Sequence, residues 1–417
     1  MASTSSENST YAKFDESIRR SIRIGDVKAI SKLKIADLSK YIDKRFKAIK
    51  ILQGSTQSPT HCKVDETDAK DNGWHNFKSG NFEEQLPKLD EETKAYAFNN
   101  SNNKNDDRSG FIVIPGCLSP QQQIFWSHHI LNDLSQPSMC KSNFKPESLF
   151  ENNLYREYVM ECSRSYKIQQ QKSGCDKQEI QGKYEKRIKA LKWTTFGHHF
   201  DFENESYGPQ HHCNSESAPG VSDDDKWHGE IPPTFAALAS HLLNSLGIAS
   251  NDGLQFQPDT AFVNFYIDRD RKAGHKNDKE HDKAAPVIGI SLLSDGIFLL
   301  GGQTSATQPI PIKLHSGDVF IMHGKSRYSV HGISCILSNT TNPQVLDGLV
   351  NHSLSCMTLP SEEGDDDATK KHKHTQALLR RYLTNLRICV NIRQVYKRRN
   401  EAQHKFYFLK NHEISYY

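Results

Sequence analysis

The second half of the chain carries a repeated pattern of short apolar runs separated by turn residues. From residue 259 onward these runs are TAFVNFYI, PVIGISLL, GIFLLGG, PIPIKL, GDVFIMHG and RYSVHGI. Gly, Pro and Asp interrupt them at close intervals, which is typical of strands joined by tight turns. The pattern therefore predicts a β-sandwich or barrel in this part of the chain.

Apolar residues spaced three and four apart predict helices elsewhere. Such spacing occurs over residues 14–52, in PPTFAALASHLLNSLGI, with Pro near its start and Gly near its end, and in HTQALLRRYLTNL. The segment QQQIFWSHHILNDL, after the Pro-Gly turn of GFIVIPGCLSP, is also expected to be helical, and RICVNIRQVYK is expected to be a final strand. Helices and strands together predict an α+β fold.

Polar stretches divide the chain into parts. We predict a basic helical extension over residues 1–52, a disordered linker over 53–107, a folded domain over 108–397 with polar insertions near 203–228 and 338–371, and a basic tail over 398–417. The extension is interpreted as a solvated amphipathic segment, with a nucleic-acid-binding or partner-binding arm as the alternative.

Composition adds limits on compartment and partner. The 417 residues are 35% apolar and 25% charged, and a net charge of +3 leaves the choice of partner to local clusters. The basic segment from Lys370 to Lys410 could neutralise nucleic-acid phosphates or form an exposed surface. Nine cysteines without a CxxC motif favour reduced thiols in an intracellular protein of the nucleus, cytoplasm or mitochondrion. No apolar run has the length of a membrane span.

Several polar residues occupy positions in the expected strands where chemistry could use them. The NFY motif places Asn264 and Tyr266 on one face of a strand, because alternate residues of a strand point the same way. His275 follows on the next segment, and His331 lies on a later strand. Two histidines and a carboxylate form the facial triad of non-haem Fe(II), which leaves positions open for a chelating 2-oxo acid and O2.

The last expected strand adds two arginines on one face, Arg387 and Arg393. A guanidinium group suits the far carboxylate of a 2-oxo acid, because it stays charged and binds both oxygens. Each piece alone is weak evidence, since a single histidine is usually a surface or core residue. The order NxY, His, His, RxxxxxR within one run of short strands is much more specific.

With these motifs the sequence resembles the AlkB-like Fe(II)/2-oxoglutarate-dependent dioxygenases, and among them the eukaryotic AlkB homologue 1 branch. The resemblance covers roughly residues 108–397 and rests on SGFIVIPGCLSP, ALKWTTFGHHFDF, VNFYIDRDRKAGH, PVIGISLLSDGIFLLGG, LHSGDVFIMHGKSRYSVHGI and LRICVNIRQV. It implies a double-stranded β-helix (jelly-roll) core flanked by helices, to which the helical N-terminal extension is added.

The resemblance also implies which residues bind each participant of the reaction. The metal ligands would include His275 and His331. The co-substrate 2-oxoglutarate would be held by four residues, Asn264, Tyr266, Arg387 and Arg393. The lid that meets the substrate would be WTTFGHHF, with four candidate substrate contacts, Trp193, His198, His199 and Phe200.

The third metal ligand departs from the family pattern. The family motif is HxD, but Asn277 stands two residues after His275. The spacing to Asn264 and to Pro286 matches the branch without a gap, which puts Asn277 at the ligand position. Asp278 would take that position if the loop bulges by one residue. An amide offers the metal a dipole where a carboxylate offers a charge, so Asn277 should weaken Fe(II) binding.

The implied activity is oxidative demethylation of methylated bases in DNA or RNA, tRNA included, with Fe(II), 2-oxoglutarate and O2. A methylated base must leave its stack to reach a buried metal. The alternative is a catalytically weakened or inactive AlkB-like nucleic-acid-binding protein, because Asn277 replaces the usual Asp. Cys389 and Asn391 replace the Asn and Thr of the family's RxNxTxR strand, while both arginines are kept. We expect no membrane association and assume a monomer.

Overall fold

Two antiparallel sheets face each other in the computed structural model, which describes residues 9–24, 26–40, 43–51, 82–90, 92–99, 106–137, 139–144, 153–171, 185–207, 231–248, 256–355 and 366–397. Nine strands of this part of the chain form the larger sheet, in the order β1 (Phe46–Ile49), β2 (Ala95–Phe98), β3 (Phe111–Ile114), β13 (Val319–Met322), β10 (Val287–Leu293), β15 (Leu386–Arg393), β8 (Thr260–Ile267), β5 (Trp193–Gly197) and β4 (Lys141–Ser142). The smaller sheet has the order β12 (Ile310–Leu314), β11 (Asp295–Leu300), β14 (His331–Leu337) and β9 (Lys272–His275). A short hairpin pairs β6 (Phe200–Asp201) with β7 (Ser206–Tyr207).

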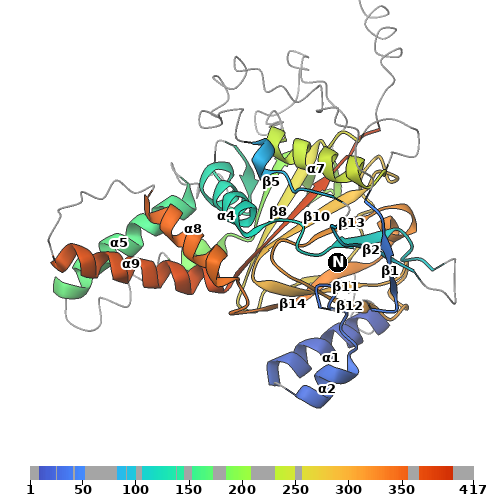
Figure 1. Ribbon diagram of the computed structural model, residues 1–417, viewed down its shortest axis with the longest axis horizontal. Coiled ribbons are helices and arrows are strands. Elements are labelled where there is room, and N and C mark those ends of the chain that lie inside the picture. The colour runs from blue at the N-terminus through green and yellow to red at the C-terminus, as the bar shows by residue number, and fades with distance from the viewer. Residues whose placement is uncertain are drawn as a thin grey trace, which may run out of the picture.

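The helices lie on the outer faces of these sheets (Figure 1). Their bounds are α1 (Thr10–Ile24), α2 (Val27–Lys32), α4 (Pro120–His128), α5 (Leu154–Gln171), α7 (Pro233–Ser245), α8 (Pro343–Ser355) and α9 (Asp366–Thr384). Three short turns complete the described elements, namely the 3-10 turns η2 (Glu83–Gln85) and η6 (Gly324–Tyr328) and the π-helical turn η3 (His129–Leu134). The helices α5, α8 and α9 extend to one side of the sheets, whereas α1 and α2 lie below the smaller sheet in the view of Figure 1.

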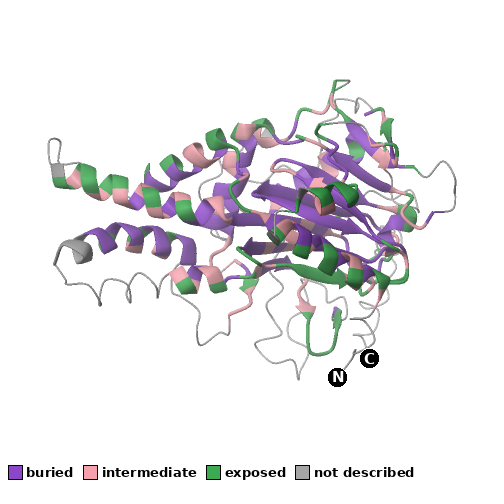
Figure 2. Ribbon diagram, turned by 90° about the horizontal axis from the view of Figure 1, so that it is seen from below, coloured by how far each residue is buried: buried purple, intermediate pink, exposed green. Residues whose placement is uncertain are grey.

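Successive side chains of the central strands point alternately into two different apolar cores. In β15, Ile388 and Val390 join the apolar cluster that also contains Trp126 and Leu242 of the helices, while Cys389 belongs to the cluster between the sheets. This follows from strand geometry, because successive side chains of a strand point to opposite faces of the sheet. One face of the larger sheet is therefore closed by helices, and the other faces the smaller sheet. Figure 2 shows that the strands at the centre of the molecule are mostly buried, whereas exposed residues lie on the helices.

Aromatic rings close the space between the two sheets at one end. Phe298 of β11 lies 5.5 Å from Phe111 of β3 and 4.9 Å from Phe320 of β13, measured between ring centroids. The ring of Phe320 lies against Gly289 of β10, where a Cβ atom would come within 2.0 Å of it. Gly289 is therefore needed for this close packing, which leaves the polar side chains of β8, β9, β14 and β15 to line the open end.

The strands and three of the helices expected from the sequence are confirmed, the helices being α4, α7 and α9. The α+β class holds, with helices on antiparallel sheets, and the apolar runs after residue 259 become β8 and β10 to β14. The helix expected in PPTFAALASHLLNSLGI is α7. The run RYSVHGI differs in part, because it begins within the turn η6 and becomes a strand only at His331.

The N-terminal segment differs from the solvated helical extension expected over residues 1–52. Its described residues are helical in α1 and α2 alone, and residues 46–49 form the edge strand β1. Tyr11 and Ile18 of α1 are buried against Ile297 and Leu299 of β11. Burial of this apolar stripe, worth about 25 cal/mol per Å², explains why the segment docks on the smaller sheet.

Two expected polar segments also contain ordered structure. Residues 95–98, within the linker expected over 53–107, form β2, and Tyr96 and Phe98 are buried. Residues 343–355, within the insertion expected near 338–371, form α8, whose Val345 and Leu349 are fully buried. The prediction is wrong for both segments because each has few apolar residues in a polar stretch of sequence, and their packing partners lie elsewhere in the chain. Residues 52–81, 208–230 and 398–417, which include most of the linker, of the insertion near 203–228 and the whole tail, lie outside the described residues.

Among the described helices, none combines the length and apolar character that crossing a membrane requires.

Candidate active site

A pocket opens between the two sheets, and its walls come from β8, β9, β14, β15 and the loop after β9. Antiparallel pairing places Cys389 opposite Asn264, and Arg387 opposite Tyr266. Because alternate residues share a face, Asn264 and Tyr266 of β8 point into the same space as Cys389 and Arg393 of β15. The predicted co-substrate residues of these two strands are thus brought together around one pocket. Asn264, Tyr266 and Arg393 line it, whereas Arg387 does not.

The two predicted histidines meet across the smaller sheet. His275 ends β9 and His331 begins β14, and the two residues are partners in the antiparallel register. Their ring centroids are 4.5 Å apart. Nδ1 of His275 lies 3.0 Å from the carbonyl oxygen of Ala273, and Nδ1 of His331 lies 2.9 Å from that of Ser329. A carbonyl only accepts, so Nδ1 carries the hydrogen in both rings and Nε2 keeps its lone pair, as a metal ligand requires.

Both rings are neutral at neutral pH. Burial lowers the pKa of His331 to about 4. Burial, and next the neighbouring His331, hold the pKa of His275 well below its ordinary value. A neutral imidazole is the form that binds a metal, so no proton has to be displaced from these two residues.

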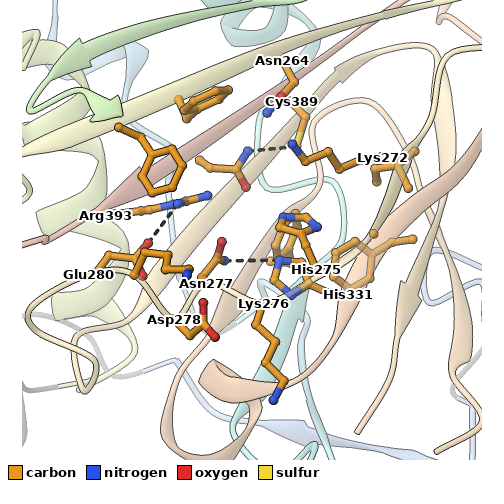
Figure 3. A pocket seen from close by; sticks show the side chains of 18 of the residues that line it. Asn264, Lys272, His275, Lys276, Asn277, Asp278, Glu280, His331, Cys389 and Arg393 are labelled. Carbon is orange, nitrogen blue, oxygen red and sulfur yellow. Dashed lines mark hydrogen bonds and ion pairs between the residues drawn. The ribbon is translucent and has the colours of Figure 1, made fainter. Parts of the chain in front are cut away.

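Asn277 stands beside the histidine pair. Its Nδ2 donates to Nε2 of His331 over 3.2 Å, and its side chain is buried (Figure 3). Turning the amide over would present Oδ1 at the same place, and an amide oxygen is an acceptable ligand for a hard divalent cation. The residues therefore fit a metal through two imidazole nitrogens and one amide oxygen, a donor set without negative charge.

Asp278 does not join this group. It is half-buried, and it lies farther from the two rings than Asn277 in Figure 3. Among the described residues, no three His, Cys, Asp or Glu side chains are close enough together to hold a metal ion. The one-residue bulge that would bring the Asp278 carboxylate to His275 and His331 is not present in the structure.

A buried ion-pair network that sequence reasoning missed supports the Asn277 loop. Oε1 of Glu280 lies 2.9 Å from Nη1 of Arg393, and its Oε2 lies 3.1 Å from Nη2 of Arg327. Arg327 also donates to the backbone carbonyls of Asn277 and Ala285. Burial opposes ionisation of Glu280, but Arg393 and Arg327 outweigh it and keep its pKa below the ordinary value. The network fixes the loop that carries Asn277 and gives Arg393 a protein partner.

Arg387 lies behind the pocket as a buried cation that forms no ion pair with an acid of the described residues. Its side chain is fully buried, and its Nη1 donates to the carbonyl oxygen of Ser294 over 2.9 Å. Its Nε and Nη2 have no hydrogen-bond partner among the described residues. The backbone of Gly296 lies so close that a Cβ there would come within 2.8 Å of Nε. A buried guanidinium with unused donors is costly unless an anion pairs with it, which fits one carboxylate of 2-oxoglutarate.

Aromatic side chains surround the outer part of the pocket, and they differ in part from the predicted lid. Of the four predicted substrate contacts, the pocket lining includes Phe200, and it adds Phe202, Tyr207 and Phe262. Phe202 is 51% exposed, an unusual state for so large an apolar side chain. The three added rings come from the hairpin β6–β7 and from β8, and the signal that the sequence offered was the FDF run at residues 200–202.

The other three predicted contacts lie outside the pocket lining. Trp193 packs behind it, with its ring centroid 5.2 Å from that of Phe202. His198 lies edge-on to Tyr396 at 4.6 Å between ring centroids. Nδ1 of His199 lies 2.6 Å from Oγ1 of Thr195. These side chains brace the rim of the pocket and do not enter it.

Three lysines complete the pocket lining, namely Lys272, Lys276 and Lys279. Lys272 of β9 reaches across the pocket towards Cys389 in Figure 3. Burial, and next Arg393, lower the pKa of its amine. The lining also contains the acids Asp278 and Glu280, of which Glu280 is paired with Arg393 and Arg327. Lysines still outnumber these acids in the lining, and the imidazoles are uncharged, which suits anionic ligands.

Comparison with known proteins agrees with the family resemblance seen in the sequence motifs. A family model described as the 2OG-Fe(II) oxygenase superfamily matches residues 110–393. The chain is 28% identical over 305 residues to the DNA N(6)-methyladenine demethylase ALKBH1A of Arabidopsis thaliana, covering 70% of this chain and 76% of that protein. It is 29% identical to the tRNA demethylase abh1 of Schizosaccharomyces pombe, with 38% of this chain and 47% of that protein covered.

The nucleic acid dioxygenase ALKBH1 of Homo sapiens is 24% identical, over 55% of this chain and 51% of that protein. The chain thus spans about half the length of the fission yeast and human relatives that it matches. The family match includes every residue that lines the pocket. The chain therefore belongs to the 2OG-Fe(II) oxygenase superfamily, in its AlkB-like ALKBH1 branch.

Proposed function

We propose that this protein is an Fe(II)/2-oxoglutarate-dependent demethylase of methylated bases in DNA or RNA, tRNA included. The observation that carries the proposal is that one site combines two neutral histidines with a buried arginine that has unused donors. His275 and His331 direct neutral Nε2 atoms to the pocket, and Arg387 keeps unused donors behind it. A metal-binding end and an anion-binding end are what a chelating 2-oxo acid requires. The names of the relatives from Arabidopsis thaliana and Schizosaccharomyces pombe support the choice of substrate.

The two facing sheets are proposed to be the double-stranded β-helix core of this superfamily. In this arrangement β8 and β15 of the larger sheet supply the co-substrate wall, and β9 and β14 of the smaller sheet supply the metal ligands. Support comes from the fully antiparallel pairing of both sheets and from the apolar cluster between them.

Each part of the pocket has a proposed task. His275, His331 and the Asn277 amide would hold Fe(II), and Arg387 would pair with a carboxylate of 2-oxoglutarate beside Tyr266. When bound, Fe(II), 2-oxoglutarate and O2 supply oxidation of an N-methyl group, whose hydroxylated product releases formaldehyde. The chain's own residues position the co-substrate and exclude water from the buried end of the pocket.

The outer pocket is proposed to receive the methylated base. Phe200, Phe202 and Phe262 offer ring faces on which an unstacked base can lie, and such stacking contributes about 1–3 kcal/mol per base. Lys276 at the rim would contact a phosphate beside it, and Lys279 would do so by exchanging its exposed partner Glu205 for the phosphate. An exposed Phe202 is then explained, because its partner is the substrate.

A second candidate function rests on one observation. The metal site contains no carboxylate within the described residues, so it binds its cation without charge neutralisation. A nucleic-acid-binding protein that has lost turnover would keep the aromatic rim and the lysines while tolerating Asn277. This candidate predicts nucleic-acid binding without co-substrate consumption.

The two candidates are separated by succinate formation from 2-oxoglutarate by the purified chain with Fe(II) and oligonucleotides carrying a methylated base. The demethylase requires succinate and formaldehyde in equal amounts, and both should rise in the Asn277→Asp variant. Asp278→Ala is the matched control and should leave turnover unchanged. Absence of succinate at saturating iron, with oligonucleotide binding intact, would establish the second candidate. Loss of turnover in Asp278→Ala alone would instead make Asp278 the metal ligand.

A further inference from the structure

A basic cavity lies between the N-terminal segment and the edges of the two sheets, and it shares no lining residue with the candidate active site. Its walls come from the end of α2, the start of β1, the end of β2 and the segment before β12. A parallel bridge between Ala36 and Ile312 joins the N-terminal segment to β12. The cavity is therefore a product of the same docking that holds α1 and α2 on the domain (Figure 1).

Three lysines give the cavity an excess of positive charge. Lys32, Lys34 and Lys44 line it and are exposed, and none of them forms an ion pair with another residue in the described part of the chain. The backbone of Lys34 is left-handed, with φ of 49°, which a residue with a side chain adopts rarely. Nη2 of Arg45 donates to the carbonyl oxygen of Lys34 over 2.7 Å and holds this turn. Lys34 is thus placed on a turn that the surrounding structure fixes, and Lys44 directly precedes the arginine that holds this turn.

Two arginines in the lining are held rigid by neighbouring acids. Arg45 contacts Asp43 through two parallel bonds, Nε to Oδ1 at 2.8 Å and Nη2 to Oδ2 at 2.7 Å. Arg108 contacts Asp106 in the same way, with both bonds at 2.7 Å. The guanidinium of Arg108 also lies 5.0 Å from the ring centroid of Phe98. Each Asp neutralises its own arginine, so the net positive charge rests on the lysines, while the arginine planes offer flat, fixed surfaces.

Most of the remaining lining is apolar. Phe14, Leu33, Phe98 and Ile310 form much of it, and the amides of Asn99 and Gln308 are at the same cavity. An inorganic anion would leave this apolar surface unused, and an apolar ligand would leave the lysines uncompensated. A ligand that joins a phosphate to a flat ring satisfies both, since rings stack on aromatic side chains and on guanidinium planes.

We propose that this cavity binds a nucleotide, with its phosphate at Lys32, Lys34 and Lys44 and its base against the apolar wall. The nucleotide is either a free one or one unit of a nucleic-acid strand. This site does not depend on the proposed demethylase activity, because it shares no residue with the candidate active site and its test measures no turnover.

The test uses the full chain and equilibrium binding. Calorimetry compares AMP with adenosine and with inorganic phosphate, and fluorescence anisotropy follows a single-stranded oligonucleotide. The test variant is Lys34→Gln with Lys44→Gln. The matched control is Lys47→Gln with Lys50→Gln, which removes the same charge from exposed positions on or next to β1 that do not line the cavity. Thermal melting checks that both double variants fold as the parent does.

A free-nucleotide site requires AMP to bind more tightly than adenosine or phosphate. AMP affinity should then fall by at least about tenfold in the test variant and stay within about twofold of the parent in the control. A strand site requires the oligonucleotide affinity to fall in the test variant only. Its dependence on log salt should then become shallower by about 0.7 for each lost phosphate contact. Unchanged binding of AMP and of the oligonucleotide in the test variant would overturn the proposal, as would equal losses in the control.

Discussion

Asn277 is the residue on which the metal chemistry of this chain depends most. It occupies the position next to the paired histidines, and its amide contacts Nε2 of His331. Arg327 holds its backbone carbonyl, so the residue cannot move away without breaking a buried contact. The site thus has the shape of a three-ligand metal site and lacks one negative charge.

Replacing that amide by a carboxylate should restore the missing charge. We expect Asn277→Asp to tighten the binding of Mn(II), a redox-inert stand-in for Fe(II), by about tenfold or more, because cation affinity rises with ligand charge. Titration of the metal-free protein, followed by the Mn(II) electron paramagnetic resonance signal, gives the dissociation constant. Asp278→Asn is the control and should change nothing. A weaker site in Asp278→Asn beside an unchanged one in Asn277→Asp would contradict the placement of Asn277.

Buried neutral histidines also make the stability of the metal-free protein depend on pH. Burial lowers the pKa of His331 to about 4, and burial together with the nearby His352 lowers that of His128 to about 4. In the unfolded chain both titrate near 6.5. The folded values are the lower ones, so the unfolded state binds more protons, and stability falls as the pH drops below 6.5 towards 4.

Between pH 8 and pH 5, each of these histidines should cost roughly 2 kcal/mol of unfolding free energy. Urea denaturation of the metal-free protein at both pH values measures the loss. His331→Asn should remove the His331 share of the pH dependence. An unchanged pH dependence in this variant would show that His331 is already accessible to protons in the folded state.

At the scale of the element, α1 acts as a brace for the strand that ends in His275. Tyr11 of α1 lies over Gly274 of β9, where a Cβ atom would come within 2.5 Å of its ring. Its hydroxyl donates to the carbonyl oxygen of Leu299 over 3.3 Å. The amphipathic pattern of residues 14–52 was visible in the sequence, but its docking surface was not, because β11 and β14 lie hundreds of residues away.

Truncation of the apolar face of α1 should therefore cost stability. Ile18 is fully buried against the smaller sheet, and Ile18→Ala should destabilise the protein by about 2–5 kcal/mol through lost burial and the cavity left behind. Glu16→Ala, at an exposed position of the same helix, is the control and should stay within about 0.5 kcal/mol. Chemical denaturation measures both, and equal stabilities of the two variants would mean that α1 is not docked in solution.

At the scale of the whole molecule, the site exists only because two sheets face each other. The smaller sheet supplies His275 and His331, and the larger sheet supplies Arg387, Tyr266 and Asn264. A ligand that touches both sheets should hold them together. Arg387 carries the charge that such a ligand would neutralise, since its guanidinium is buried and forms no ion pair with any described residue.

Binding of 2-oxoglutarate with Mn(II) should raise the free energy of unfolding by about 2.7 kcal/mol at a ligand concentration of 100 times Kd. Arg387→Met should abolish this ligand-dependent increase. Arg381→Met, at an exposed arginine that pairs with Glu185, is the control and should keep it. Differential scanning fluorimetry with and without 2-oxoglutarate measures the effect. Full retention in Arg387→Met would mean that the co-substrate carboxylate is bound elsewhere.

The sequence by itself determined the strands and helices that have a clear hydrophobic period and the order of the motif residues. It also determined that position 277 holds an amide where the family has a carboxylate. These are local properties, since side-chain period and motif spacing are written along the chain. Only the tertiary structure decided that Glu280 and Arg327 are buried partners, that Phe202 and Tyr207 line the pocket in place of Trp193 and His198, and that α1 and β2 belong to the fold. Such contacts join residues far apart in sequence, and burial of a charged or aromatic side chain depends on which surface packs against it.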